Sequence, residues 1–293
     1  MPPVSTTLFK VRHYECDAYG HLNNANYLRY MEEAAFDASA AVGYDRARYQ
    51  ALGRLWLARE TEIEYLRPAR YGDTLAVRTW VEDFRRVRSR RRYEFHLLPA
   101  AELVAQASTD WVYLDAAAQQ PLAVPPEMVA AFAGAEPLPP AAPRAPFPAP
   151  PPAPPGAFTA RRRVEWRDID SAWHVNNAVY LAYIEDCGVQ VAGAFGWPLA
   201  RCQAAGFAIA ARRHHIVYRR PAALGDELTV TTFVVGFQRA TATRCFTVRQ
   251  AASGAVVAEA RTLWVWLSAR TGRPVRIPAQ FAADFAPNIA ASG

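Results

Sequence analysis

The stretch Asp17-Ala-Tyr-Gly-His21-Leu-Asn23-Asn24-Ala-Asn-Tyr27 occurs a second time as Asp170-Ser-Ala-Trp-His174-Val-Asn176-Asn177-Ala-Val-Tyr180. Each copy places a histidine four residues after an aspartate, and then two asparagines and a tyrosine. The offset between the copies, 170 minus 17, is 153 residues. Self-similarity at a fixed spacing indicates a duplication, and this period is too long for a solenoid. The chain is therefore predicted to contain two copies of one domain.

The same offset continues well beyond the motif. It aligns Gly43 with Gly196 and Pro68 with Pro221, and no gap is needed between these positions. A length of 293 residues favours two domains, and each half is long enough to bury a core. Eleven of the 23 prolines lie between Pro137 and Pro155, which indicates a semi-rigid extended linker. The predicted division is an N-terminal domain 1–133, a Pro/Ala-rich linker 134–157 and a C-terminal domain 158–293.

The composition is that of a globular protein, with 52% hydrophobic and 20% charged residues. The net charge of +6 favours acidic ligands or partners without choosing among them. The four cysteines form no CxxC pair, which favours free thiols in a reducing compartment. No apolar run of membrane-spanning length and no signal-peptide pattern is seen. We therefore expect a cytoplasmic protein that binds neither membrane nor nucleic acid.

Hydrophobic patterning predicts the same order of elements in both halves, namely a strand, a long helix and four strands. In the first half the helix begins near Asn23 or Asn24, where an asparagine caps the first amides, and Gly43 ends it. Consecutive hairpin-joined strands imply an antiparallel sheet that one helix can cover. The predicted strands of the first half are 7–14, 55–66, 74–84, 89–98 and 102–114. In the second half they are 158–166, 207–219, 227–237, 241–250 and 256–267, with a helix over 177–195 and a short cap after Pro278.

The first copy of the motif, from Val11 through Asp17 and His21 to Tyr27, resembles the signature of hotdog-fold acyl thioesterases. It is most similar to the 4-hydroxybenzoyl-CoA and long-chain acyl-CoA thioesterase branch. The second copy resembles the signature of acyl-ACP thioesterases. The resemblance implies an α+β fold of two tandem hotdog domains, each a long central helix wrapped by an antiparallel sheet. The two would form a pseudo-twofold double hotdog, a pseudo-dimer within one chain, with further homo-oligomerisation left open.

The resemblance also implies the chemistry. Thioester hydrolysis needs an activated nucleophile and stabilisation of charge on the carbonyl oxygen. In the resembled families the aspartate is catalytic as base or nucleophile, and the histidine and asparagine position substrate and water. Amides at the helix N-terminus would polarise the carbonyl. The residues carried over in this way are Asp17, His21 and Asn23 in the first half and Asp170, His174 and Asn176 in the second.

One departure distinguishes the two halves. In plant-type acyl-ACP thioesterases, which this chain resembles, the motif has the form Asp-x-Asn-x-His. A glutamate follows later in those sequences, just before Tyr-Arg-Arg. The asparagine position is Tyr19 in the first copy and Ala172 in the second. The glutamate position is Glu64 in the first copy but Val217 in the second. The first half is therefore predicted to be the working site, which inverts the plant arrangement.

Further residues are predicted to bind the substrate. Asn24 and Tyr27 belong to the motif itself. The run from Arg85 to Arg92 contains six arginines and is predicted to be a hairpin tip. Its members Arg86, Arg88 and Arg90 would hold the phosphates of CoA or an acidic acyl carrier protein, because a guanidinium donates parallel hydrogen bonds to phosphate. A solvated hairpin without a ligand is the alternative.

Other interpretations stay open at this point. Asp17 and Asp170 could be helix caps, and His21 and His174 could be core residues with internal partners. The protein could be an inactive hotdog that binds an acyl thioester or acyl carrier protein. A hotdog dehydratase is disfavoured because it resembles a different arrangement, a histidine paired with a helical carboxylate. Each half offers one motif histidine and no close second ligand, so neither a metal nor any other cofactor is expected.

Overall fold

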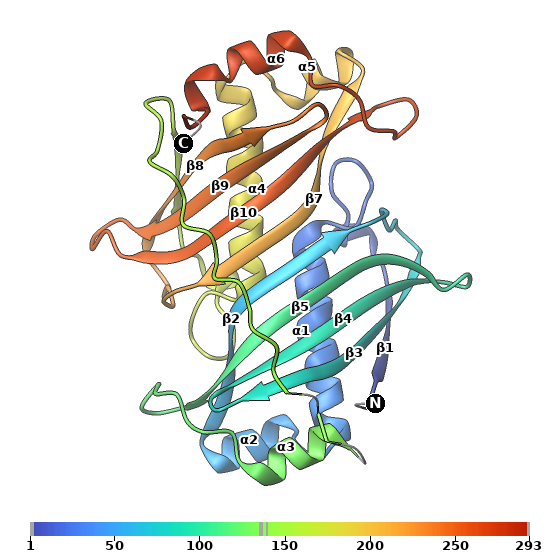
Figure 1. Cartoon of the computed structure of the whole chain (residues 1–293), viewed down its shortest axis with the longest axis vertical. Helices are drawn as coiled ribbons and strands as arrows, with labels where there is room; N and C mark the ends of the chain where they lie inside the picture. The colour runs from blue at the N-terminus through green and yellow to red at the C-terminus, as the bar shows by residue number, and fades with distance from the viewer. Residues whose placement is uncertain (1–2, 135–136, 139, 292–293) are drawn as a thin grey trace. The chain divides into compact units, whose positions relative to one another are not determined.

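The structure, a computed structural model, describes residues 3–134, 137, 138 and 140–291. The chain divides into two compact units, Met1–Pro146 and Phe147–Gly293. The Pro/Ala-rich segment thus contributes to both units. Each unit contains one copy of the motif and its own long helix and sheet (Figure 1).

The first unit has a long helix, α1, that packs against strands β1 and β3 and lies across one face of the sheet (Figure 1). The helix begins where the sequence predicts, because the Asn23 side chain caps it. The elements are β1 (Ser5–Lys10), η1 (His13–Glu15), α1 (Asn24–Ala41), α2 (Arg46–Leu52), β2 (Arg54–Tyr65), β3 (Thr74–Arg85), β4 (Arg88–Leu98), β5 (Glu102–Asp115) and α3 (Pro126–Ala133).

The strands of this unit are antiparallel and follow the order β1-β3-β4-β5-β2. The prediction that every consecutive pair forms a hairpin is wrong at one point, since β2 pairs with β5 and not with β3. Strand β1 occupies the place beside β3 and pairs Lys10 with Thr74. The connection between β2 and β3 instead passes the motif, where Leu22 N donates to Ala69 O (2.8 Å) and Val11 N donates to Asp73 O (2.8 Å).

The second unit repeats this plan with the strand order β7-β10-β9-β8-β6. The predicted order of strands and long helix is confirmed in both units. The first strand of each unit is shorter than predicted, because a 3-10 helix lies between this strand and the motif. The elements are β6 (Phe158–Arg163), η2 (Trp166–Asp168), α4 (Asn177–Ala194), α5 (Leu199–Ala204), β7 (Phe207–Tyr218), β8 (Glu227–Phe237), β9 (Thr241–Gln250), β10 (Val256–Ser268), α6 (Ala279–Asp284) and η3 (Ala286–Asn288).

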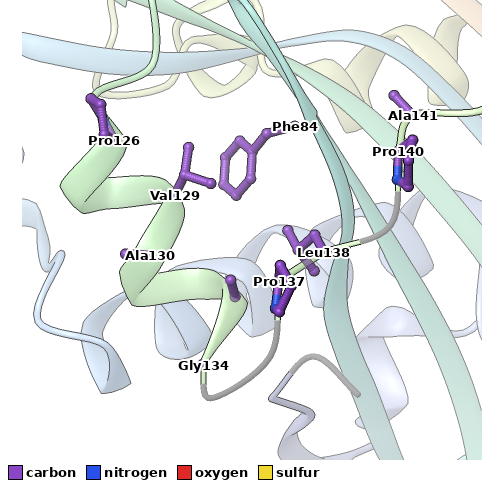
Figure 2. Close-up of a pocket in the computed structure, with 10 residues that line it drawn as sticks. Phe84, Pro126, Val129, Ala130, Gly134, Pro137, Leu138, Pro140 and Ala141 are labelled. Carbon is purple, nitrogen blue, oxygen red and sulfur yellow. The ribbon is translucent and has the colours of Figure 1, made fainter.

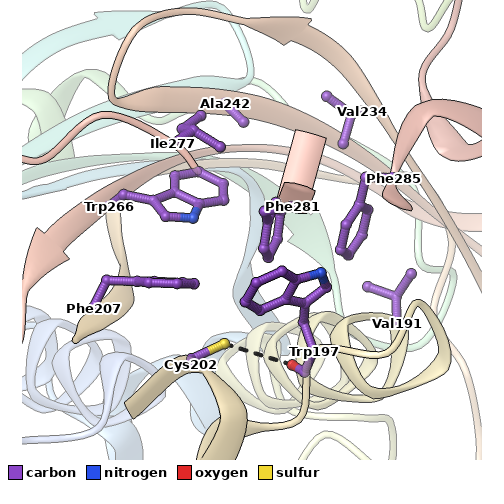
Figure 3. Close-up of a cluster of buried hydrophobic side chains, with 10 residues drawn as sticks. All are labelled: Val191, Trp197, Cys202, Phe207, Val234, Ala242, Trp266, Ile277, Phe281 and Phe285. Carbon is purple, nitrogen blue, oxygen red and sulfur yellow. Dashed lines mark hydrogen bonds between the residues drawn. The ribbon is translucent and has the colours of Figure 1, made fainter. Parts of the chain in front are cut away.

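An aromatic cluster closes the core of the second unit beyond the end of α4 (Figure 3). Phe281 of α6 is 3% exposed, stacks on Phe285 at 4.5 Å and lies 5.2 Å from the rings of both Trp197 and Trp266. The cap predicted after Pro278 is thus a helix whose apolar side chains complete the core. The short helices α2, α3 and α5 were not predicted from the sequence.

Arg144 anchors the Pro/Ala-rich segment to the first unit. Its Nη2 lies 2.6 Å from both carboxylate oxygens of Asp83, and its Nη1 contacts Asp110. Both aspartates are almost fully buried in the sheet. Nearby, Arg85 Nη2 donates to Ala142 O (2.5 Å). The segment therefore supplies the positive charge that two buried carboxylates need.

Candidate active site

The motif loop holds Asp17 between η1 and α1. Its Oδ1 accepts hydrogen bonds from the backbone amides of Tyr19 (2.8 Å) and His21 (3.1 Å). This is an aspartate turn, in which a side chain fixes the backbone that follows it. Within the described residues both hydrogen bonds end on Oδ1, and Asp17 is partly exposed. The second carboxylate oxygen is therefore available for a water or a substrate.

Asn23, and not Asp17, caps helix α1. The Asn23 Oδ1 accepts from Ala25 N (3.0 Å), and Asn176 caps α4 in the same way through Ala178 N (2.9 Å). The interpretation of Asp17 as a helix cap is therefore wrong. The backbone amide of Asn26 also donates a hydrogen bond within the unit, to Asn23 O at 2.9 Å. A ligand at the N-terminal end of α1 would therefore be attracted chiefly by the positive end of the helix dipole.

His21 lies beside Asp17 and is partly buried. Burial lowers the pKa of its imidazole, the charge of Arg70 lowers it further, and Asp17 opposes both effects. The backbones of His21 and Arg70 are also paired. At neutral pH the ring is therefore uncharged and offers one donor and one acceptor nitrogen.

The second unit brings its aspartate and histidine into contact. Asp170 Oδ1 accepts from Ala172 N (2.8 Å) and lies 3.6 Å from His174 Nδ1. The loop carries Trp173 at φ 64°, where the first unit has Gly20 at φ 73°. A left-handed backbone disfavours a residue with a side chain by about 1 kcal/mol or more. The two loops share a backbone but present different surfaces.

An acid behind each motif loop, buried in the first unit and partly buried in the second, was missed by the sequence reasoning. Glu15 Oε2 accepts from Tyr30 Oη (2.6 Å) and from Arg12 N (2.8 Å). In the second unit Asp168 Oδ2 accepts from Tyr183 Oη at the same distance, 2.6 Å. These bonds tie the loop to the long helix two residues before each motif aspartate. The signal was present in the repeat, since an acid and a tyrosine recur at the same offset.

Tyr27, predicted to bind the substrate, lies in the core of the first unit. It is 2% exposed and packs edge-on against Tyr65 (5.2 Å) and Phe95 (5.1 Å), and burial raises its pKa. Tyr65 Oη also donates to the backbone oxygen of Asn24 (3.4 Å). Asn24 therefore sits at the helix start, where its backbone carbonyl joins the helix to strand β2.

Glu64 points to the sheet face opposite the one that α1 covers. Neighbouring strand residues alternate between faces, and Tyr65 faces the helix. Glu64 Oε2 instead accepts from Gln106 Nε2 (2.8 Å) on the outer face. Within the first unit the structure does not bring Glu64 together with Asp17. Glu64 therefore no longer marks the first half as the better-equipped site.

The arginine run surrounds the tip of a β-hairpin, as predicted, and most of its residues lie in the two strands. Strand β3 ends at Arg85 and β4 begins at Arg88. Arg90 Nη2 donates to Ser108 Oγ (2.7 Å), and its guanidinium lies within 4.0 Å of three carboxylates, those of Glu62, Glu82 and Asp110. Arg90 is thus engaged by its own unit, whereas Arg86 and Arg88 remain exposed at the tip.

The tip also lies far from the motif of its own unit. The motif adjoins the start of β3, where Val11 pairs with Asp73, and the tip follows the end of β3. The twelve residues of β3 span about 36 Å at ~3.3 Å per residue. The structure therefore does not bring Arg86, Arg88 or Arg90 together with Asp17 of this unit.

An apolar, solvent-open pocket of about 530 Å³ lies between α3 and the Pro/Ala-rich segment (Figure 2). Phe84, Val129 and Leu138 are among its lining residues. It belongs to the hairpin end of the unit, since Val124 N donates to Arg86 O (2.9 Å) just before α3. The pocket is thus remote from Asp17 of the same unit.

Neither a metal centre nor a membrane-spanning helix is found among the residues that the structure describes. Among these residues, no group of three or more His, Cys, Asp or Glu side chains is arranged to hold a metal ion. None of the described helices is long and apolar enough to cross a membrane.

The family model of the Thioesterase-like superfamily matches the chain twice, at residues 11–132 and 164–285. These matches cover more than half of the chain, and the protein belongs to this superfamily. FadM of Escherichia coli strain K12, a long-chain acyl-CoA thioesterase, is 29% identical over 123 residues, which are 42% of this chain and 92% of FadM. YneP of Bacillus subtilis strain 168 is 30% identical over 120 residues, 41% of this chain and 86% of YneP.

A chloroplastic acyl-acyl carrier protein thioesterase of Arabidopsis thaliana, ATL2, is 29% identical over 106 residues, 36% of this chain and 56% of ATL2. Among solved structures, the 12:0-ACP thioesterase from Umbellularia californica has a TM-score of 0.71 at 18% identity and covers 90% of this chain and 94% of its own. An acyl-ACP thioesterase from Bacteroides thetaiotaomicron has a TM-score of 0.70 at 19% identity, with 89% and 97% covered. The predicted fold class, α+β with two tandem hotdog domains, is confirmed.

Proposed function

We propose that this protein hydrolyses acyl-CoA or acyl-ACP thioesters to a free acid and a thiol, with Asp17 as the base or nucleophile. The observation that supports Asp17 most is its geometry. One carboxylate oxygen is fixed by two backbone amides, and the other is available at the partly exposed N-terminal end of α1. Such a carboxylate is held in one orientation and can still reach a water or a carbonyl carbon.

In the base mechanism, Asp17 removes a proton from water as the water oxygen attacks the thioester carbon. The carbon–sulfur bond then breaks, and the thiolate leaves and takes up a proton. In the nucleophile mechanism, the Asp17 carboxylate attacks the thioester carbon, the carbon–sulfur bond breaks and the thiolate leaves and takes up a proton. Water then hydrolyses the resulting anhydride to the free acid and the Asp17 carboxylate. Both routes place negative charge on the carbonyl oxygen, which the positive end of the α1 dipole stabilises.

His21 and Asn23 have positioning roles in this proposal. The neutral His21 ring donates a hydrogen bond from one nitrogen and thereby orients the carbonyl or the water. Asn23 fixes the helix start through its oxygen, which leaves its amide group to face the loop. Asp170, His174 and Asn176 form the corresponding set in the second unit.

We favour the first unit as the working site for an electrostatic reason. His174 Nδ1 lies 3.6 Å from the carboxylate of Asp170, so in the second unit the two side chains already face each other. In the first unit Arg70 disfavours protonation of His21, and Asp17 is left to act as base. The relatives support both substrate classes, since FadM acts on long-chain acyl-CoA and ATL2 on acyl-acyl carrier protein.

The test is thiol release from a panel of acyl-CoAs, from short to long and aromatic, and from acyl-ACPs of the same chains. A matched oxygen ester reports non-specific esterase activity. The proposal expects turnover of at least one thioester and little of its oxygen ester. A protein that binds these ligands but releases no thiol in a single turnover would instead be an inactive acyl-thioester-binding hotdog.

A further inference from the structure

The first unit exposes an unusual group of aromatic rings beside the motif. Among its described residues, the large hydrophobic side chains with the greatest exposed fractions are Tyr14 at 77% and Tyr71 at 65%. Tyr14 belongs to η1, and Tyr71 belongs to the connection between β2 and β3. His13 joins the two segments, because its ring meets that of Tyr71 edge-on at 5.8 Å and 84°. Rings that favour burial are here held in water next to the Asp17 loop.

Two arginines flank these rings. The Arg12 guanidinium donates to Tyr14 Oη (3.0 Å) and lies 6.0 Å from the centre of that ring. Arg70 precedes Tyr71, and its charge reaches the His21 imidazole. Arg12, His13, Tyr14, Arg70 and Tyr71 are all exposed, and we name them the aromatic–arginine surface.

These residue types together match one ligand chemistry. Aromatic faces stack on planar heterocycles, with about 1–3 kcal/mol per base. Guanidinium groups bind phosphate through parallel charge-assisted hydrogen bonds. A surface with both, next to a site for a thioester, fits a nucleoside phosphate attached to the thiol. We propose that the aromatic–arginine surface binds the phosphorylated adenosine end of coenzyme A, so that acyl-CoA is the preferred substrate.

The second unit provides an internal comparison, because the same five positions there carry one arginine instead of two and add a carboxylate. The counterparts, in the same order, are Glu165, Trp166, Arg167, Ala223 and Leu224. Arg12 is replaced by a carboxylate of opposite charge, and Arg70 by an alanine. The remaining surface has Trp166 and Trp173 packed edge-on at 6.1 Å, and Arg167 pairs with Glu165 at 2.9 Å. At these positions the second unit therefore offers a phosphate one exposed arginine, which is already paired, whereas the first unit offers two beside Asp17.

This inference rests on the proposed function and names its substrate class. It assigns the phosphates of coenzyme A to the aromatic–arginine surface near Asp17, and not to the hairpin tip. The aromatic–arginine surface is continuous in the chain with the motif. Arg12 lies five residues before Asp17, and the backbone of Arg70 pairs with that of His21. The hairpin tip, about 36 Å away along β3, has neither property.

The test is calorimetric binding of adenosine 3′,5′-bisphosphate to the full-length protein, compared with Arg70→Ala and Tyr71→Ala. Each substitution is expected to weaken binding about tenfold, the equivalent of 1.4 kcal/mol. Leu224→Ala, at the position of Tyr71 in the second unit, is the matched control and is expected to leave the Kd unchanged. All three side chains are exposed, so the fold should persist, and the thermal unfolding midpoint verifies this.

Steady-state kinetics provide a second test of the inference. Tyr71→Ala should raise the KM for acyl-CoA about tenfold with little change in kcat, and should leave the KM for the matching acyl-pantetheine unchanged. Equal KM values of the wild type for acyl-CoA and acyl-pantetheine, or no nucleotide binding, would overturn the inference. A higher KM of Arg70→Ala for acyl-ACP without any nucleotide binding would assign the surface to a carrier protein and overturn it too. Nucleotide binding requires no hydrolysis, so a wild type that binds it but releases no thiol contradicts only the proposed function.

Discussion

Replacing Arg144 with methionine should destabilise the first unit far more than an ordinary substitution in a proline-rich segment. The Arg144 side chain is 17% exposed, and its guanidinium contacts Asp83 and Asp110, whose side chains are each 6% exposed. Methionine keeps much of the packing and removes the charge. Asp110 then retains Arg90, which lies 3.9 Å away and is shared with other acids.

The expected loss at pH 7.5 is about 3 kcal/mol, the lower part of the range for breaking a buried ion pair. The loss should shrink as the pH falls. Burial already raises the pKa of Asp110, while Arg144 and Arg90 oppose the rise. Without Arg144 the folded-state pKa rises further above its unfolded value, so the variant binds more protons when folded and gains stability on acidification.

Urea unfolding at pH 7.5 and pH 5.0, followed by circular dichroism, measures both quantities. The control is Arg167→Met, because the Arg167 side chain is 82% exposed and pairs only at the surface. A triple variant with Asp83→Asn and Asp110→Asn should recover part of the loss. An Arg144→Met midpoint equal to that of the control, or a loss that does not depend on pH, would refute the reasoning.

Three further predictions concern stability. Burial lowers the pKa of the fully buried His214 to about 3, below its ordinary 6.5. Stability should therefore fall as the pH drops through 6.5, by about 2 kcal/mol at pH 5, and less in His214→Gln when urea midpoints are compared across this range. Phe281→Ala should lose about 4 kcal/mol in urea unfolding, because it empties the centre of the aromatic cluster in Figure 3, whereas exposed Leu224→Ala should lose little. Asn23→Ala and Asn176→Ala should each lower stability by about 1 kcal/mol through loss of a cap, and equal urea midpoints to wild type would contradict the capping role.

The parts of the fold that were predictable are those governed by local chemistry. The caps at Asn23 and Asn176 and the glycine after each long helix determine the helix bounds, and alternation determines the strands. Because the sequence repeats, the elements predicted for the second half could be compared with those predicted for the first. The place of β1 beside β3 was not predictable, because a pairing across some seventy residues leaves no local pattern.

The site was harder to predict because side-chain direction depends on strand register. Strand β2 has an irregularity between Ala58 and Glu60, which changes the face that earlier residues occupy. The direction of Glu64 therefore followed only from Tyr65 and its bond to the helix. From the sequence, the arginine run was interpreted as a polar turn. In the structure Arg90 and Arg91 lie on opposite faces of β4, and Arg91 is buried. The buried pairing of Arg144 likewise requires the folded sheet.

The most direct test of the central claim is single-turnover hydrolysis of one acyl-CoA by Asp17→Asn and, in parallel, by Asp170→Asn. Asparagine keeps the shape of the side chain and the turn and removes the basic oxygen. We expect the Asp17 variant to lose about 10²-fold or more in rate and the Asp170 variant to stay near wild type. Full activity in Asp17→Asn, or its loss only in Asp170→Asn, would contradict the assignment of the chemistry to the first unit.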